Sequence, residues 1–170
     1  NNIIIFSSDK PGGYGGSDLY MCKWEGGKWS KEINLGDLVN SKGDEVFPYL
    51  ANDSVLFYSS DGLMGFGGLD IFQTQLNDGK WSTPENLKKP LNSSYDDFGI
   101  LLSKNLTEGL FSSNRPDGFG SDDIYAFRNL KHAPEAVEIP RLLVSGTVQE
   151  LGTNFPINDA TVFLYDPASD

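Results

Sequence analysis

The sequence contains few of the residues that build metal centres and catalytic triads. Of its 170 residues, one is a cysteine, Cys22, and one is a histidine, His132. A single cysteine excludes an internal disulfide and a cysteine-based zinc site. The histidine lies in a polar, proline-containing stretch, so the repeated region has no Ser-His-Asp triad. We expect Cys22 to be a buried filler residue in a strand rather than a nucleophile.

Positive charge and long apolar runs are also scarce. Lysine and arginine total 13 against 24 acidic residues, and the net charge is −11. This balance disfavours nucleic acid and anionic lipid as partners, but it suits a partner with a cationic patch. Apolar runs such as 3–6 are too short to span a bilayer, and no signal peptide is visible. We therefore expect no direct membrane insertion, and an exported protein would need a targeting segment upstream of residue 1.

Glycine is abundant, and it occurs within a repeat of about fifty residues. Nineteen glycines and nine prolines separate short apolar runs, which predicts short strands joined by tight turns. FSSDKPGGYGGSDLY, from Phe6, returns as YSSDGLMGFGGLDIF from Tyr58 and as FSSNRPDGFGSDDIY from Phe111. The similarity continues in GGKWSKEINLG and DGKWSTPENLK, which begin at Gly26 and Asp78.

A period near fifty is typical of β-propeller blades, each a four-stranded antiparallel sheet. In the second unit the pattern predicts strands at 45–51, 55–60, 69–76 and 80–87, with a hairpin turn at 77–79. Strand 55–60 is apolar on both faces, as expected for a sheet between two others. The predicted fold is all-β, with about three propeller blades forming a partial ring, because closed rings need about four to eight.

The predicted domains are the blades at 1–128, a linker at 129–140 and the start of a β-sandwich at 141–170. The last region contains two strand-like runs, 142–148 and 160–165. The third unit lacks the tryptophan-bearing outer strand, and the first unit lacks its inner strand. We therefore expect the chain to be a piece of a larger ring, whose missing outer strand comes from upstream.

The units resemble the TolB-type, WD40-like propeller repeats of bacterial envelope proteins. The resemblance rests on the Ser-Ser-Asp or Ser-Ser-Asn step, the Gly-x-Gly-Gly-x-Asp loop from Gly65 to Asp70, and the following Ile-Phe or Ile-Tyr. The segment VSGTVQELGTNFPINDATVFLYD resembles the opening of carboxypeptidase-regulatory-like domains. This order of modules is similar to the middle of OmpA-family, peptidoglycan-associated proteins of Bacteroidetes, including the PorE-like component of type IX secretion.

The resemblance implies a periplasmic protein associated with the outer membrane. It also implies helical repeats upstream and a peptidoglycan-binding OmpA-like domain downstream, neither of which lies in this sequence. The implied partners are envelope proteins of the outer membrane or of a secretion complex, with peptidoglycan bound through the absent domain. Because propellers host both enzymes and scaffolds, the resemblance does not settle the function.

Features present in every unit are expected to build the fold. Asp18, Asp70 and Asp123 each open a strand after a glycine-rich loop, where a carboxylate can accept backbone N–H bonds. The alternative is a metal or catalytic role. Trp29 and Trp81 are expected to pack on the outer strands, and the alternative is a sugar-stacking platform. The glycine loops lead into strands rather than helices, so they are not phosphate loops.

Two sets of residues are candidate partner contacts. Acidic residues should gather on one rim, either as a solvated surface or as a docking face for a basic partner: Asp9, Asp44, Glu45, Asp61, Asp96, Asp97, Asp117 and Asp122. Calcium is a further alternative for this rim, although no EF-hand-like spacing occurs. The second set comprises loop residues that we treat as non-repeated, with packing between blades as the alternative. They are Tyr14, Met64, Phe66, Arg115 and Phe119.

The sequence thus predicts a non-catalytic periplasmic scaffold without a cofactor, whose propeller mediates protein–protein interaction in a peptidoglycan-anchored complex. The alternative is a glycan-binding or glycan-processing propeller. That alternative requires exposed tryptophans and a unique carboxylate pair at the ring centre. A third possibility, the propeller of a serine peptidase, is disfavoured by the sandwich-like tail.

Overall fold

The computed structural model describes residues 2–116 and 118–128, which form only strands, turns and irregular segments. The all-β prediction is confirmed for these residues, and they contain no helix that could cross a membrane. The chain divides into two units, Asn1–Ala133 and Pro134–Asp170, and every described residue belongs to the first. The predicted linker and the predicted sandwich strands lie outside the described residues.

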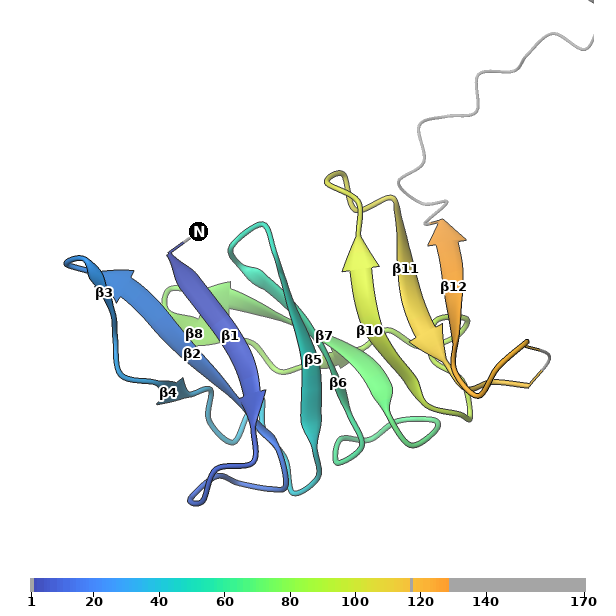
Figure 1. The fold of residues 1–170 in the computed structure, drawn as a ribbon, viewed down its shortest axis with the longest axis horizontal. Coiled ribbons are helices and arrows are strands. Elements are labelled where there is room, and N and C mark those ends of the chain that lie inside the picture. The colour runs from blue at the N-terminus through green and yellow to red at the C-terminus, as the bar shows by residue number, and fades with distance from the viewer. Residues whose placement is uncertain (1, 117, 129–170) are drawn as a thin grey trace, which may run out of the picture. The chain divides into compact units, whose positions relative to one another are not determined.

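The described residues form three antiparallel sheets that follow one another along the chain (Figure 1). The first contains β1 (Ile3–Ser8), β2 (Asp18–Glu25), β3 (Lys28–Trp29) and β4 (Ile33–Asn34). The second contains β5 (Glu45–Ala51), β6 (Val55–Ser60), β7 (Asp70–Asn77), β8 (Lys80–Trp81) and β9 (Glu85–Asn86). The third contains β10 (Asp97–Leu102), β11 (Glu108–Ser113) and β12 (Asp123–Arg128).

The strands predicted for the second unit are confirmed, with one correction at the outer edge. The predicted strand at 80–87 is wrong in extent, because β8 and β9 are separate. Its interruption follows from a serine at the same position of the first and second sheets. Ser82 Oγ accepts the N–H of Gln75 at 3.1 Å, and Ser30 Oγ accepts that of Lys23 at 3.0 Å. A hydroxyl thus takes a bond that a backbone carbonyl would otherwise accept, and regular pairing stops there.

The predicted hairpin at 77–79 is present. Asn77 pairs with Lys80, which leaves a two-residue turn with φ of 50° at Asp78 and 78° at Gly79. Two consecutive positive φ values are characteristic of the type I′ turn, whose twist matches that of the flanking strands.

Two apolar clusters hold the sheets together face to face. The first cluster consists of Leu19, Val39, Leu56, Tyr58 and Phe72. The second cluster consists of Ala51, Phe57, Ile71, Ile100 and Phe111. Alternate residues of β6 enter different clusters, so the second sheet is buried on both faces, as its sequence predicts. Burying one large side chain of this kind contributes about 1.5–3 kcal/mol.

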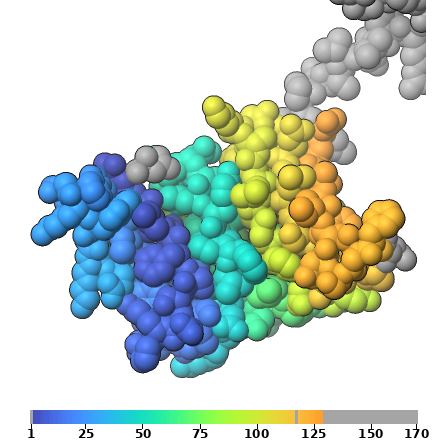
Figure 2. Space-filling view, viewed as in Figure 1, coloured from blue at the N-terminus to red at the C-terminus, as the bar shows by residue number. Residues whose placement is uncertain are grey.

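The outward faces of the first and third sheets remain apolar and exposed. Ile4 and Trp24 are exposed on the first sheet, and Leu101, Leu110 and Ile124 are exposed on the third. Figure 2 shows the three sheets next to one another in chain order. They do not close into a ring within the described part of the chain.

Candidate functional site: a loop rim with exposed aromatic residues

The connections β1–β2, β6–β7 and β11–β12 lie at the same end of the sheets, at the lower edge of Figure 1. We define the loop rim as these three loops, 9–17, 61–69 and 114–122, together with the segments 41–44 and 93–96 that lead into β5 and β10. Residue 117 lies outside the described residues. The repeat places each loop at the same point of its sheet.

An aspartate at the start of the following strand holds each loop, and it is buried in the first two sheets. Asp18 accepts the N–H of Tyr14 at 2.7 Å and that of the next residue at 3.1 Å. Asp70 accepts the N–H of Phe66 at 2.7 Å and that of the next residue at 3.0 Å. Asp123, which is half-buried, accepts an N–H three residues before it at 3.1 Å. The carboxylates therefore replace backbone partners that the loops lack.

The glycine before each aromatic loop residue is required by this arrangement. A Cβ at Gly13, Gly65 or Gly118 would collide with the carboxylate of Asp18, Asp70 or Asp123, respectively. Only a residue without a side chain can pass so close to the buried acid.

An exposed aromatic residue occupies the same position in all three loops. Tyr14 and Phe66 are 41% and 48% exposed, and Phe119 is fully exposed. The expectation that these residues are not repeated is wrong. Each of them lies four residues before the aspartate that recurs in every unit, Asp18, Asp70 or Asp123. Met64, in the second loop, is 94% exposed. The rim thus presents a row of aromatic side chains on a hydrogen-bonded backbone.

One rim aspartate connects the first loop to the second sheet, and another connects the second loop to the third sheet. Asp44 Oδ1 accepts the N–H of Ser17 at 2.6 Å, and Asp96 Oδ1 accepts that of Leu69 at 2.9 Å. Asp61 Oδ1 in turn accepts the N–H of Asp44 at 2.7 Å. These carboxylates hold the backbone of the rim, and they also bring negative charge to its surface.

Asp44, Asp61 and Asp96 line a surface hollow of about 450 Å³ together with Phe47. The Phe47 ring stacks on that of Phe98 with centroids 5.0 Å apart. Phe47 has φ of 53°, and the residue at its repeat position, Gly99, has φ of 66°. Such a backbone costs a non-glycine residue on the order of 1 kcal/mol. Phe47 was not among the predicted contact residues, although its alignment with Gly99 in the repeat marks it as unusual.

Glu45 and Asp97 are not partner contacts, so that prediction is wrong. Both are completely buried at the start of an inner strand. Glu45 accepts hydrogen bonds from Ser41 N at 2.8 Å and from Ser60 Oγ at 2.6 Å. Asp97 accepts bonds from Ser93 N at 2.5 Å and from Ser93 Oγ at 2.8 Å. They fix the entry into β5 and β10 instead.

Arg115 is also a predicted partner contact, but its guanidinium binds groups of its own chain. Its Nη2 forms an ion pair with the buried Asp97 and donates to the carbonyl of Leu91 at 2.8 Å. Its Cζ lies 5.0 Å from the Phe111 ring centre and 5.1 Å from that of Tyr125. The prediction is therefore wrong, because the charge is already paired.

Asparagine side chains that were not among the predicted site residues continue the strand pairing at the outer edge. Asn40 accepts the N–H of Leu19 at 2.7 Å and donates to its carbonyl at 3.1 Å. Asn92 makes both bonds to Ile71 at 2.8 Å. In the sequence, the recurrence of Val-Asn-Ser at 39–41 as Leu-Asn-Ser at 91–93 indicates that this asparagine has the same role in both units.

The two predicted packing tryptophans differ in their surroundings. Trp81 is half-buried and packs against the first cluster. Trp29 is 42% exposed and meets Trp24 edge-on, with centroids 5.2 Å apart and an interplanar angle of 69°. Cys22 is half-buried on the same sheet.

Two titratable groups of the first and second sheets have shifted pKa values. The Lys10 ammonium, which donates to Glu32 at 2.6 Å, lowers the pKa of that partly exposed carboxyl. Burial raises the pKa of Tyr58, whose hydroxyl donates to the carbonyl of Val39 at 3.0 Å. Within 2–116 and 118–128, no three His, Cys, Asp or Glu side chains are grouped to hold a metal ion.

Comparison with known proteins adds no assignment. No protein-family model matches the chain, and a search of curated proteins gives no match. Its function is therefore inferred from the rim and from the residues of the repeat.

Proposed function

We propose that the three sheets are blades of a β-propeller that serves as a non-catalytic docking module for a protein partner. The observation that carries the proposal is the row of Tyr14, Phe66 and Phe119 on the loop rim. One aromatic residue per repeat, exposed at the same position, gives a contact surface that continues from sheet to sheet.

The physical chemistry of the row suits protein recognition. Aromatic and methionine side chains are enriched in interface cores, and a few such residues carry most of the binding energy. Phe66 lies on a backbone held by the buried Asp70, so little further ordering is needed when a partner binds. The adjacent Met64 enlarges the apolar surface.

The charge of the rim favours a partner with basic residues. Asp44, Asp61 and Asp96 surround the hollow beside the row, and the chain has a net charge of −11. The Phe66 ring already has the Lys89 ammonium 5.9 Å from its centre, so the three carboxylates rather than this ring carry the preference for a basic partner. The negative electrostatic potential of the rim speeds association with a basic protein surface and disfavours binding of acidic proteins.

The resemblance to OmpA-family envelope proteins suggests where this docking takes place. We place the protein in the periplasm, in an outer-membrane-associated complex that is held to peptidoglycan by a domain outside this sequence. A component of the type IX secretion machinery is the partner class that this resemblance favours.

Affinity capture from detergent-solubilised envelopes tests the docking function. The bait is the full chain, compared with a variant in which Tyr14, Phe66 and Phe119 are replaced by serine. The matched control replaces Ile33 and Leu38, which are exposed elsewhere, by serine. We expect a discrete protein to be retained by the wild type and the control and lost by the rim variant. Retention by all three, or by none, would contradict the proposal.

Glycan binding remains the second candidate because Trp24 and Trp29 form an exposed aromatic pair. Their edge-on geometry offers one indole face rather than a flat two-ring platform. Calorimetric titration with soluble peptidoglycan fragments distinguishes the candidates. Saturable binding that Trp29→Ala abolishes would favour the glycan function, whereas absence of heat would count against it.

A further inference from the structure

We infer that the outer edge of β12 and the cavity beside it form an acceptor site for one further strand that carries a tryptophan. The inference rests on the internal repeat and does not depend on the proposed function. It concerns the third sheet, and the first and second sheets, which both have outer strands, show what occupies the equivalent place.

Strand β12 has a partner on one side only among the described residues. Its counterparts are paired on both sides: β2 lies between β1 and the pair β3 and β4, and β7 lies between β6 and the pair β8 and β9. In contrast, β12 pairs with β11 alone in the described part of the chain. An unpaired edge presents a row of backbone donors and acceptors to another chain segment.

The backbone groups at this edge can be identified from the repeat. Leu19 and Ile71 direct their N–H and C=O groups toward the outer strands, where Asn40 and Asn92 bind them. Ile124 occupies the same position of the third sheet. Because pairing alternates along a strand, its N–H and C=O point away from β11.

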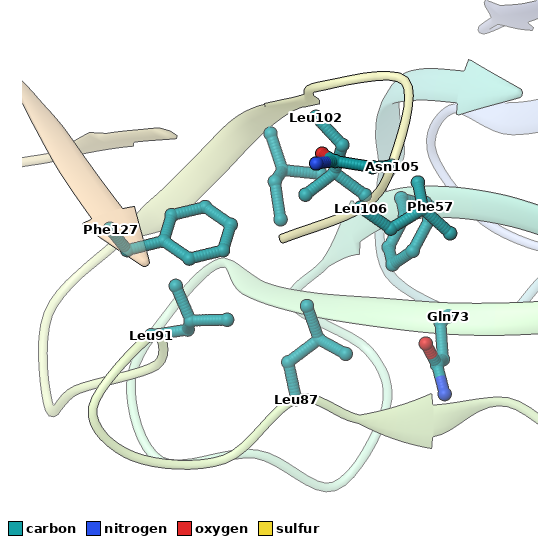
Figure 3. A pocket seen from close by; sticks show the side chains of 9 residues that line it. Phe57, Gln73, Leu87, Leu91, Leu102, Asn105, Leu106 and Phe127 are labelled. Carbon is teal, nitrogen blue, oxygen red and sulfur yellow. The ribbon is translucent and has the colours of Figure 1, made fainter. Parts of the chain in front are cut away.

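A cavity of about 290 Å³ between the second and third sheets lies beside this edge (Figure 3). Its wall is apolar and includes Leu87, Leu91, Leu102, Leu106 and Phe127. In Figure 3 these side chains extend into one shared space.

The equivalent place between the first and second sheets is occupied by a tryptophan. There Leu35, Val39 and Leu50, the repeat counterparts of Leu87, Leu91 and Leu102, belong to one packed cluster with Trp81. Trp81 comes from β8, the outer strand, and the described residues of the third sheet contain no counterpart of it. The cavity is therefore the space that an outer-strand indole would fill.

A polar contact seen in one of the two sheets that have outer strands agrees with the same occupant, whereas in the second sheet the corresponding Asn86 Nδ2 and Asp70 Oδ1 have no hydrogen-bond partner. In the first sheet Asn34 Nδ2 donates to the buried carboxylate of Asp18 at 2.7 Å. Asn34 lies five residues after Trp29, and the second unit repeats this spacing. Asp123 is the third counterpart of Asp18 and is only half-buried. The occupant is thus an extended segment of the pattern Lys-Trp-Ser-x-x-x-Asn-Leu, added antiparallel to β12.

A peptide with the sequence of residues 78–88, DGKWSTPENLK, is the probe. Fluorescein-labelled peptide is titrated with the full chain, and binding is followed by fluorescence anisotropy. Two control peptides replace its tryptophan or its asparagine by alanine. We expect saturable binding that weakens at least about tenfold without the tryptophan and several-fold without the asparagine.

Two protein variants locate the binding. Leu106→Trp places an indole in the cavity and should abolish peptide binding, whereas Leu110→Trp, on the opposite face of the sheet, should leave it unchanged. Hydrogen exchange should slow in fragments containing β12 when the wild-type peptide is added. The inference is overturned if the peptide does not bind, if the alanine peptides bind equally well, or if β12 gains no protection. Because all three of these outcomes are measured on the wild-type chain, misfolding of a variant does not affect them.

Discussion

Glu45 and Asp97 occupy the same repeat position, and their side chains differ by one methylene. Glu45 Oε1 reaches Ser60 Oγ directly at 2.6 Å. In the third sheet Arg115 spans the remaining gap, because its Nε donates to Ser113 Oγ at 3.0 Å and its Nη2 pairs with Asp97. A longer acid in one sheet and a shorter acid with an arginine in the other thus fill the same buried space.

This comparison predicts a compensating pair of substitutions. Arg115→Gly leaves Asp97 buried without its cation, and we expect the free energy of unfolding to fall by about 3 kcal/mol. Adding Asp97→Glu recreates the arrangement of the second sheet, where Gly62 stands at the position of Arg115. Most of the lost stability should then return. Urea titration of the single and double variants measures both steps, and a double variant no more stable than the single one would refute the equivalence.

Tyr58 predicts a dependence of stability on alkaline pH. Burial raises its pKa above the ordinary value of 10.0, so the folded state keeps the proton that the unfolded state loses. The stability from this group is complete below pH 10.0 and falls as the pH rises further. Between pH 10 and 11, Tyr58→Phe should flatten the decline in unfolding free energy by about 1 kcal/mol per pH unit. Tyr14→Phe, at an exposed site, is the control and should leave the decline unchanged.

Some side-chain roles could be predicted from the sequence, and others could not. The repeated loop-to-strand position of Asp18 suggested that its carboxylate would bind loop N–H groups. By contrast, Asp44 and Glu45 are adjacent acids, and the sequence does not tell which one points inward. Strand alternation decides this, because the second acid begins β5 and enters the sheet while the first remains on the rim.

At the scale of elements, the glycine-rich loops depend on close passage over a buried acid. Gly65→Ala places a Cβ against the Asp70 carboxylate and should lower the free energy of unfolding by about 1–3 kcal/mol. Gly120→Ala is the matched control, since the nearest atom to its Cβ would be Asp122 O at an ordinary 3.4 Å. Urea unfolding of both variants checks the difference, and equal losses would contradict the proposed role of Gly65.

The elements of the second unit were predictable because two local signals agree there. The apolar pattern of 55–60 indicates a strand buried on both faces, and Asn-Asp-Gly indicates a tight turn. The break in the outer strand was not predictable from apolar pattern or propensity. It depends on the Ser82 hydroxyl bonding to Gln75 across the sheet, which becomes apparent only when the strands are paired.

At the scale of the whole molecule, the described sheets leave an apolar face at each end of the series. Trp24 is exposed on the first sheet and Leu101 on the third, whereas equivalent faces between sheets are buried. Further sheets of a propeller would cover these faces, which agrees with the proposed fold. The repeat could be predicted from the sequence, whereas the stacking could not, because it depends on which face of each strand turns toward its neighbour.

In the rim, aspartates hold the backbone of the glycine loops, and the loops expose aromatic residues. The repeat places those residues along one end of the sheets. The most direct test is the affinity of the full chain for the protein it captures, measured by surface plasmon resonance. We predict that serine at Tyr14, Phe66 and Phe119 together weakens binding at least about 100-fold, because interface energy concentrates in a few aromatic side chains. The wild-type affinity should also fall with added salt. Unchanged affinity of a folded rim variant would contradict the docking function.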